Sequence, residues 1–346
     1  MLYRFFQTFI LILKNKLMDN NNIRKIALFT SGGDAPGMNA CIRGVVRASL
    51  YHGVQVNGIV RGYAGMIEGK FIDLNARSVS NIIQRGGTIL KSARCEEFKT
   101  EEGMKQAFYN LRAARIDAVI AIGGDGTFKG GAEFSSRYNI PFIGIPGTID
   151  NDMYGTDYTI GYDTALNTVV EAIDKIRDTA SAHDRLFFIE VMGRDAGFIA
   201  LQSGIAGGAE AILIPESKTD IEKLIEDLEN GWRRKKSSSI VIVAEGDEAG
   251  GAFEIAAQVK EKLNSKYDIR VTILGHIQRG GSPTCADRVL ASRLGVAAVE
   301  ALIQGQKNVM VGIINNKIAY TDFSKATKHH YTINKDMLRI SEILSY

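Results

Sequence analysis

The sequence predicts an α/β protein of two units, each with a mostly parallel sheet between layers of helices. From Ile26 onward, short apolar runs alternate with segments of helical periodicity, which is typical of parallel strands joined by helices. Several of these runs end in glycine-rich loops, and the alternation begins again near Gly161. The chain has 346 residues, 45% hydrophobic and 23% charged. It is therefore long enough for two packed domains.

In the first half, three predicted strands run into glycine-rich loops. The strands are expected over 26–30, 117–122 and 142–145, and the loops that follow read SGGDAPG, GGDG and PGTIDND. A helical pattern over Met38–His52 follows the first loop. Because the carboxyl ends of parallel strands meet at one edge of a sheet, we expect all three loops to face one ligand crevice.

The second half repeats this alternation. Strands are expected at the apolar runs 185–192, 211–214, 240–245 and 270–277, the last two buried. Helices are expected over Asp163–Thr179, from Ile221 onward, and over Phe253–Leu263. For the helix that begins near Ile221, Thr219 with Glu222 predicts a capping box and Gly231 predicts the end.

Charge and cysteine content narrow the partners and the compartment. The net charge is +3 with both signs interspersed, which does not favour a nucleic-acid partner. The three cysteines, Cys41, Cys95 and Cys285, have no short spacing. A disulfide framework and a zinc site are therefore not indicated, and we expect a reducing cytoplasm.

The first 22 residues do not read as a signal peptide or a membrane anchor. Their apolar stretch Phe5–Leu13 contains Gln7, is followed by lysines and has no small-residue cleavage site. It also lacks the sustained helical pattern of an amphipathic anchor. We expect residues 1–22 to form a disordered extension and expect no association with a membrane.

The glycine loops are suited to phosphate, because glycine lets backbone N–H groups approach its oxygens closely. Gly32–Gly37 has the GxxxxG spacing of a P-loop, but Met38 and Asn39 replace the required Lys and Ser/Thr. No GxGxxG with an acidic residue about twenty positions later follows the first strand. A Walker-type NTPase and a dinucleotide oxidoreductase are both disfavoured.

Asp125 is a lone carboxylate between glycines. Such a residue can hold Mg²⁺ against a polyphosphate whose oxygens the loop amides contact. The alternative is a tight turn in which the aspartate bonds its own backbone.

In the next loop, Thr148, Asp150 and Asp152 occupy every second position. If the loop is extended, all three side chains would point to the same side, into the crevice. Asp150 is our candidate for the base that accepts a hydroxyl proton in phosphoryl transfer to an alcohol. Cationic residues at strand ends suit a substrate that carries its own phosphate, although each alone could be a surface charge. These are Arg185, Arg194, Arg270, His276 and Arg279.

Six segments together resemble the bacterial type of ATP-dependent 6-phosphofructokinase. They read SGGDAPGMNACIRGVVRA, GGTILKSARCEEF, IGGDGT, PGTIDNDMYGTDYTIGYDTALNTVVEAID, EVMGRDAGF and LGHIQRGGSP, and the likeness extends from Ile23 to Gly312. The resemblance implies two Rossmann-like three-layer domains with mostly parallel sheets. Residues 23–161 plus about 274–324 would bind ATP, and 162–273 plus about 325–346 would bind fructose 6-phosphate.

The resemblance also implies a reaction, in which the γ-phosphoryl group of ATP passes to the 1-hydroxyl of fructose 6-phosphate with Mg²⁺ as cofactor. Asp150 would be the base, with Thr148 and Arg194 beside the transferring group. The implied nucleotide site consists of Gly33, Tyr63, Arg94, Cys95, Gly124, Asp125, Gly126 and Thr127, with Asp125 on the metal. The implied sugar-phosphate site consists of Thr148, Ile149, Asp150, Met192, Gly193, Arg194, Glu245, His276, Ile277, Gln278 and Arg279.

Two further implications concern assembly and regulation. Arg185 and Arg270 match the family's pair that reaches into a neighbouring subunit's site, which implies a homotetramer. An effector site for ADP or phosphoenolpyruvate is matched by Arg43, Arg47, Arg177, Gly208, Glu210, Arg234 and Lys236.

Spacing and residue type support the effector site in part. Arg43 and Arg47 are spaced i, i+4 and would share one helix face, and Glu210 suits a magnesium ligand of a bound diphosphate. The chain departs from the family at Ala76, where an arginine is frequent, and over 235–239. The alternative is that these cations form ion pairs between subunits and bind no effector.

The sequence leaves two alternative functions open, a pyrophosphate-dependent phosphofructokinase and a catalytically silent sensor of nucleotides or sugar phosphates. The pyrophosphate-using branch typically has Asp and Lys where this chain has Gly126 and Gly147, which leave room for an α-phosphate, although RDAGFIA leans toward that branch. A catalytically silent sensor is disfavoured because Asp125, Asp150 and Arg194 are intact. Lipid and NAD kinases share GGDGT but not PGTIDND or GHIQRGG.

Overall fold

The computed structural model describes residues 23–182, 185–234, 239–263, 267–326 and 333–345, which form two compact units. Within these residues, the first unit comprises everything up to Gly147, Tyr154–Asp157 and the segment from Arg288 to 326. The second comprises Thr148–Met153, Tyr158–Asp287 and the C-terminal helix. Residues 148–153, 158–161 and 274–287, which we had expected in the ATP-binding domain, thus belong to the second unit. The extension 1–22 lies outside the described residues.

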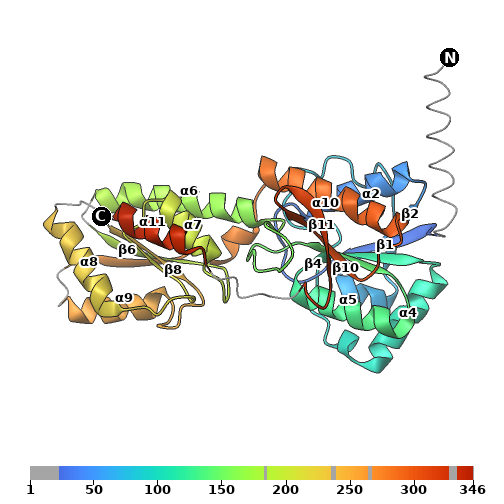
Figure 1. Ribbon diagram of the computed structural model, residues 1–346, viewed down its shortest axis with the longest axis horizontal. Helices are drawn as coiled ribbons and strands as arrows, with labels where there is room; N and C mark the ends of the chain where they lie inside the picture. The colour runs from blue at the N-terminus through green and yellow to red at the C-terminus, as the bar shows by residue number, and fades with distance from the viewer. Residues whose placement is uncertain (1–22, 183–184, 235–238, 264–266, 327–332, 346) are drawn as a thin grey trace, which may run out of the picture. The chain divides into compact units, whose positions relative to one another are not determined.

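The first unit is built on a seven-stranded sheet (Figure 1). Its order is β11-β10-β5-β4-β1-β2-β3, and only the edge strands β3 and β11 are antiparallel to their neighbours. The strands are β1 Lys25–Thr30, β2 Gln55–Ile59, β3 Phe71–Leu74, β4 Ala118–Gly123, β5 Phe142–Pro146, β10 Val309–Ile314 and β11 Lys317–Asp322. The predicted strands β1, β4 and β5 are adjacent, so their glycine loops leave the sheet at one edge as expected.

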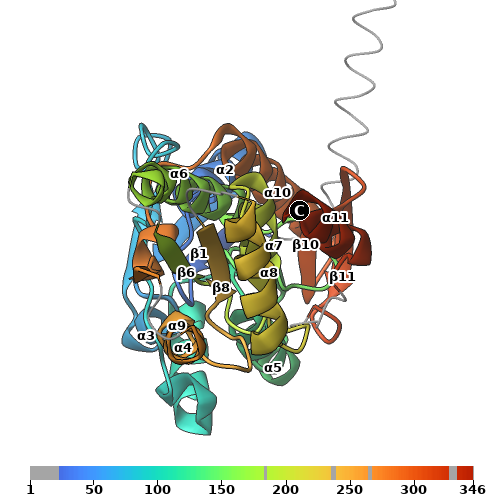
Figure 2. The ribbon, with the colours of Figure 1, turned by 90° about the vertical axis from the view of Figure 1, so that its left-hand side faces the viewer.

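Helices cover both faces of this sheet, with α2 and α10 on one side and α4 and α5 on the other (Figures 1 and 2). Gly44 on α2 and Gly295 on α10 allow the two helices to pack closely, because a Cβ at Gly44 would lie 3.1 Å from the Ser292 carbonyl oxygen and one at Gly295 2.9 Å from that of Cys41. The helical segments are α2 Met38–Tyr51, α3 Gly62–Glu68, η1 Glu97–Lys99, α4 Glu101–Ala113, α5 Asp125–Tyr138 and α10 Cys285–Ile303.

The second unit has a four-stranded parallel sheet in the order β7-β8-β6-β9. Helices α6, α7 and α11 cover one face, and α8 and α9 cover the other (Figure 1). The strands are β6 Leu186–Val191, β7 Ala211–Leu213, β8 Ser239–Ala244 and β9 Ile269–Ile273. The helical segments are α6 Tyr162–Ser181, α7 Phe198–Ala206, α8 Ile221–Arg233, α9 Ala252–Lys262, η2 Gly275–Arg279 and α11 Lys335–Ser345. The expected three-layer α/β architecture is confirmed.

Local predictions in this unit need correction. The strand expected over 270–277 ends at Ile273, is an edge strand rather than a buried one, and gives way to η2. The capping box is also wrong, since Asp220 caps α8 by accepting hydrogen bonds from the Glu222 and Lys223 amides at 2.9 and 3.1 Å. Aspartate is the stronger cap, and the Thr219 hydroxyl instead donates to Asp247 at 2.8 Å.

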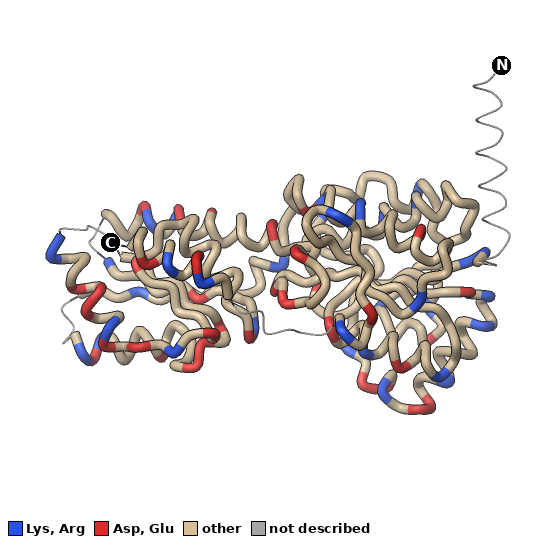
Figure 3. Tube along the Cα trace, in the orientation of Figure 1, with Lys and Arg blue, Asp and Glu red and all other residues tan. Residues whose placement is uncertain are grey.

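The distribution of charge, the apolar character of the helices and the state of the cysteines apply to both units. Basic and acidic residues are interspersed along the described chain (Figure 3). None of the described helices combines the length and apolar character that crossing a membrane requires. Cys41, Cys95 and Cys285 are free thiols.

Candidate active site

The ligand edge of the first sheet lies where the strand order reverses. From β1 the chain proceeds to β2 on one side, whereas β4 lies on the other side of β1. The carboxyl ends flanking such a reversal form the usual binding crevice of an open α/β sheet. The loop that carries Gly33 follows β1, and Gly124 and Asp125 follow β4. A hydrogen bond of 2.9 Å from the Ser31 amide to the Ile122 carbonyl holds the start of the first loop against β4.

The glycines after β4 serve two different purposes. A Cβ at Gly123 would lie 2.4 Å from the Thr127 hydroxyl and 2.7 Å from the Ser31 carbonyl oxygen, so close packing requires glycine there. A Cβ at Gly124 or Gly126 would meet nothing within 4 Å. These two positions therefore leave the N-terminus of α5 accessible, and a helix N-terminus favours phosphate.

Asp125 is the first residue of α5, preceded by Gly124 as N-cap, so it begins a helix. Its side chain is 15% exposed, and Oδ2 lies 2.7 Å from Nζ of Lys129, one helical turn later. Within the described ranges, no group of three or more His, Cys, Asp or Glu residues could hold a metal. A single carboxylate still fits Mg²⁺ that arrives with a nucleotide, because this ion usually takes one or two carboxylates plus substrate phosphates.

The other expected nucleotide residues differ in exposure. The Tyr63 ring is 7% exposed and stacks on Phe98 at 3.9 Å between ring centroids, and its hydroxyl donates to the Thr127 carbonyl at 2.6 Å. Tyr63 thus lies in the core and positions Thr127. Arg94 is exposed. Burial raises the pKa of the Cys95 thiol, which is therefore protonated at neutral pH.

Asn39 positions the loop that leads to Arg94, a role that the sequence did not indicate. The side chain is 1% exposed. Its Nδ2 donates to the carbonyls of Arg85 and Gly86 at 3.1 and 3.0 Å, and its Oδ1 accepts from the Ile89 amide at 2.8 Å. The asparagine that replaces the P-loop hydroxyl residue therefore ties α2 to a distant loop.

In the second unit, expected substrate residues gather at the carboxyl ends of three neighbouring strands. Met192, Gly193 and Arg194 follow β6, Glu245 follows β8, and η2 with His276, Ile277, Gln278 and Arg279 follows β9. Oε1 of Glu245 accepts from the amides of Gly193 and Arg194 at 3.3 and 2.8 Å. Gln278 is fully buried and accepts from the Met192 amide at 3.2 Å. These bonds join the three loops into one cluster.

Asp150 belongs to the same unit and faces one of these residues. The Asp150 side chain is 3% exposed, and its Oδ2 lies 3.5 Å from Nε of Arg194, whose side chain is 49% exposed. The loop bends rather than remaining extended as expected, because the Asp150 amide donates to the Thr148 hydroxyl at 3.3 Å and Asn151 has a φ of 53°. Ile149, in the same loop, is fully buried.

Arg185 and Arg270 lie at the amino ends of the strands of the second sheet, opposite to the carboxyl ends that carry Arg194. They stand at the amino ends of β6 and β9 and share one carboxylate, with Arg185 Nε 2.9 Å and Arg270 Nη2 3.0 Å from the two oxygens of Asp268. Within a single chain, the five cationic residues at strand ends therefore do not form one cluster. Strand direction separates this pair from Arg194 by the length of a strand.

The expected effector residues are divided between the units. Arg43 and Arg47 lie on α2 of the first unit, half-buried and exposed respectively. In the second unit, Nη2 of Arg177 donates to the carbonyls of Gly207 and Gly208 at 2.5 and 2.7 Å, which caps the end of α7.

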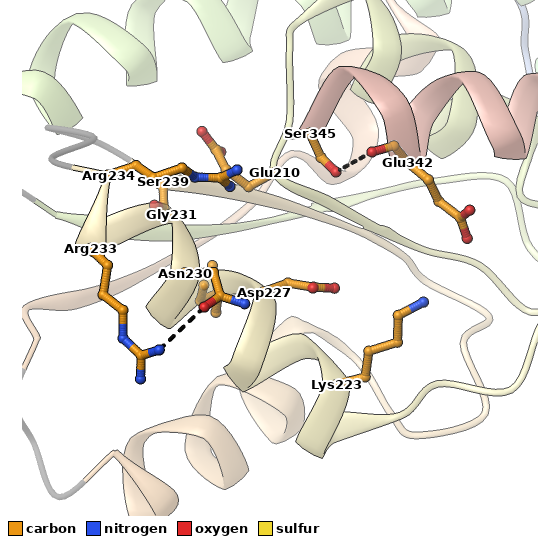
Figure 4. A pocket seen from close by; sticks show the side chains of 11 residues that line it. Glu210, Lys223, Asp227, Asn230, Gly231, Arg233, Arg234, Ser239, Glu342 and Ser345 are labelled. Carbon is orange, nitrogen blue, oxygen red and sulfur yellow. Dashed lines mark hydrogen bonds between the residues drawn. The ribbon is translucent and has the colours of Figure 1, made fainter.

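Glu210 and Arg234 line a pocket of about 550 Å³ beside α8 and α11 (Figure 4). Oε2 of Glu210 accepts from the Ile240 amide at 2.5 Å, so one oxygen already stabilises the pairing of β7 with β8. Lys236 lies outside the described residues.

Fold and site together define a class of protein, the phosphotransferases built from two Rossmann-like units. One unit offers a helix N-terminus with a lone carboxylate, and the other holds a buried carboxylate beside an arginine. Residues 25–302 match the family model described as phosphofructokinase. The chain belongs to the phosphofructokinase family.

Individual relatives agree with this assignment. ATP-dependent 6-phosphofructokinase 2 of Bacteroides thetaiotaomicron is 56% identical over 323 residues, which cover 93% of this chain and 99% of that protein. Phosphofructokinase from Saccharomyces cerevisiae superposes with a TM-score of 0.85 at 34% identity, over 93% of this chain and 48% of the yeast chain. A pyrophosphate-dependent phosphofructokinase from Marinobacter aquaeolei has a TM-score of 0.79 at 24% identity, over 93% and 91%. That last likeness concerns the fold alone.

Proposed function

We propose that this protein transfers the γ-phosphoryl group of ATP to the 1-hydroxyl of fructose 6-phosphate, giving fructose 1,6-bisphosphate and ADP in glycolysis. The observation that carries the proposal is the buried Asp150 beside Arg194, in a chain 56% identical to an ATP-dependent relative. A coupled assay with fructose 6-phosphate and either ATP or pyrophosphate tests it. No product with either donor would refute it.

On the acceptor side, the chain needs a proton acceptor and cations. Asp150 accepts the proton of the attacking hydroxyl, and burial keeps water from competing with it. Arg194 is half-exposed and able to meet the negative charge of the transferring group. His276 and Arg279 bind the sugar phosphate, and Glu245 accepts a hydrogen bond from a sugar hydroxyl through the oxygen that does not hold the β6 loop.

On the donor side, Gly124 and Gly126 leave the N-terminus of α5 accessible to the phosphates of ATP. Asp125 would hold Mg²⁺ there, and the ion would neutralise the charge that develops on the phosphate oxygens. Tyr63 fixes Thr127 in this first turn through its 2.6 Å hydrogen bond. The chain thus supplies positioning and charge, which is most of what phosphoryl transfer requires.

The choice between ATP and pyrophosphate as donor depends on Gly126 and Gly147, and the structure supports ATP more strongly at one of them than at the other. A Cβ at Gly147 would lie 2.9 Å from Cγ2 of Ile122 and 3.2 Å from Cε of Met38, so packing alone already favours glycine there. Gly126 has open space, which supports room for a nucleotide. Of the two glycines, Gly126 is therefore the one that favours ATP.

We predict that the wild type uses ATP and is nearly inert with pyrophosphate. Gly126→Asp should lower kcat/KM for ATP by about a hundredfold or more, because juxtaposed like charges cost several kcal/mol. Gly126→Ala is the matched control, since its added methyl meets nothing within 4 Å. The measurement is the steady-state rate of the wild type and both variants with ATP and with pyrophosphate. A wild type that prefers pyrophosphate would show that Gly126 does not select ATP.

Assembly and compartment belong to the same proposal. Arg185 and Arg270 are held as a pair at the edge of the second sheet opposite to Arg194, which supports their service to a neighbouring subunit and hence a homotetramer. Three free thiols in the described chain are consistent with a reducing cytoplasm.

The proposed effector site takes ADP or phosphoenolpyruvate and is tested through Arg43 and Arg47. An effector alters catalysis only by its different affinity for two states, a coupling of typically about 1–3 kcal/mol. We expect either ligand to change the apparent affinity for fructose 6-phosphate by about five- to 150-fold in the wild type. The Arg43→Ala/Arg47→Ala variant should lose this response. If neither ligand acts on the wild type, the cations are structural; if both still act on the variant, the site is elsewhere.

A further inference from the structure

The loop that carries Asp150 has little regular structure to hold it. β5 ends at Pro146, and the residues from Thr148 to Asp152 belong to neither a helix nor a strand. Asn151 adopts a left-handed backbone with φ of 53°. The bond from the Asp150 amide to the Thr148 hydroxyl is long, at 3.3 Å. A base needs a defined position to accept a proton, so other contacts must hold this loop.

Thr159 makes those contacts on both sides of Asp150. It is 1% exposed. Its amide donates to Oδ1 of Asn151 at 2.8 Å, and its hydroxyl lies 2.7 Å from the Thr148 carbonyl oxygen and 3.2 Å from Oδ1 of Asn151. A hydroxyl has one proton to donate, and the shorter distance assigns it to Thr148. Thr159 therefore binds the residues two before and one after Asp150.

Thr159 is itself fixed, because it precedes the N-terminus of the 20-residue helix α6. Asp287, which is 1% exposed, accepts the Gly161 amide on Oδ1 at 2.8 Å. Its Oδ2 accepts the Thr164 amide at 2.8 Å and the Thr164 hydroxyl at 2.5 Å. The helix start is thus tied to a second buried group, and α6 offers a rigid support for the loop.

We propose that Thr159 is a positioning residue for the base: its hydroxyl and amide hold the loop 148–151 so that the Asp150 carboxylate stays in its reactive position beside Arg194. This inference rests on the proposed function, in which Asp150 accepts the substrate proton. A displacement of about 1 Å at a reacting group can cost about 100-fold in rate. Loss of one hydrogen bond at Thr159 should therefore be visible in turnover.

Thr159→Val keeps the shape of the side chain and removes the hydroxyl. We expect kcat to fall by about 10- to 100-fold, while KM for fructose 6-phosphate and for ATP stays within about twofold, as for an interaction that acts in the transition state. Thr159→Ser retains the hydroxyl and should recover most of kcat. A variant with reduced affinity and unchanged kcat would overturn the proposal.

Thr168→Val is the matched control. It removes a hydroxyl from the same helix region, one that donates to the Thr164 carbonyl at 3.0 Å and does not touch the loop. It should leave kcat near the wild-type value. Asn151→Gly is an independent variant, because glycine keeps the left-handed backbone while the acceptor of the Thr159 amide is lost. Asn151→Gly should reproduce the selective loss of kcat. It therefore still tests the proposal if Thr159→Val folds poorly.

A double-mutant cycle with Asp150→Ala separates positioning from general destabilisation. If Thr159 acts through Asp150, Thr159→Val should lower kcat no further once the carboxylate is gone. An undiminished effect in the Asp150→Ala background would overturn the inference and leave the proposed function intact. Near-normal turnover of Asp150→Ala alone would instead refute Asp150 as the base, and with it this inference, while the phosphoryl transfer itself would still stand.

Discussion

Asp150→Ala should lower kcat by about 10²–10⁴-fold, the range expected when a positioned general base is lost. KM for fructose 6-phosphate should change little, because the groups expected to bind the sugar phosphate, among them Glu245 and His276, come from other loops. The measurement is steady-state kinetics with saturating ATP, combined with direct titration of fructose 6-phosphate.

Asp150→Asn is the control for packing, since it fills the same buried space at 3% exposure and lacks a basic carboxylate. It should lose kcat to a similar extent and retain the fold, as judged by the melting temperature. Near-normal turnover in either variant would show that another group takes the proton.

Asp125→Ala should abolish turnover with Mg-ATP, because the Mg²⁺ ion proposed to neutralise the developing charge would lose its protein ligand. Rates are measured over a titration of Mg²⁺ at fixed ATP, and binding of the nucleotide is followed separately. The expected result is a rate at the background of the assay even when Mg²⁺ is in large excess.

Lys129→Ala provides the matched control for Asp125→Ala. It breaks the same ion pair from the other side, at a lysine that is 63% exposed. Exposed pairs of this kind contribute about 0–1 kcal/mol, so Lys129→Ala should fold normally and keep its turnover. Recovery of Asp125→Ala at ordinary Mg²⁺ concentrations would contradict the metal assignment.

Local patterns predicted the ligand edge of the first unit well. β1, β4 and β5 were each visible as an apolar run that ends in glycine, and their adjacency follows from the rules of parallel sheets. The pattern failed where neighbouring residues compete for one role. Asp220 rather than Thr219 caps α8, because aspartate is the stronger cap and the Thr219 hydroxyl donates to Asp247, 28 positions away.

The grouping of the arginines shows a second limit. Arg185 and Arg194 flank the same strand β6, and a strand of six residues spans roughly 20 Å. Both are strand-end positions in the sequence, yet they lie at opposite edges of the sheet. Arg185 joins Arg270 through Asp268, whereas Arg194 joins Asp150. Which cationic residues form one site therefore depends on strand direction and on pairing with carboxylates elsewhere.

Local residue types and spacing were enough to predict the α/β class, the glycine loops and the family, and to select Asp125 and Asp150 as the acidic residues of interest. The contacts that hold the site residues in place come from segments far apart in the chain, and no local pattern indicates them. Asn39 binds a loop 46 to 50 positions away, and Asp287 binds the start of α6 from 126 positions away. Thr159 fixes Thr148 across 11 positions. Such bonds form only when the fold brings buried donors and acceptors together, since a buried polar group must find a partner wherever the chain supplies one.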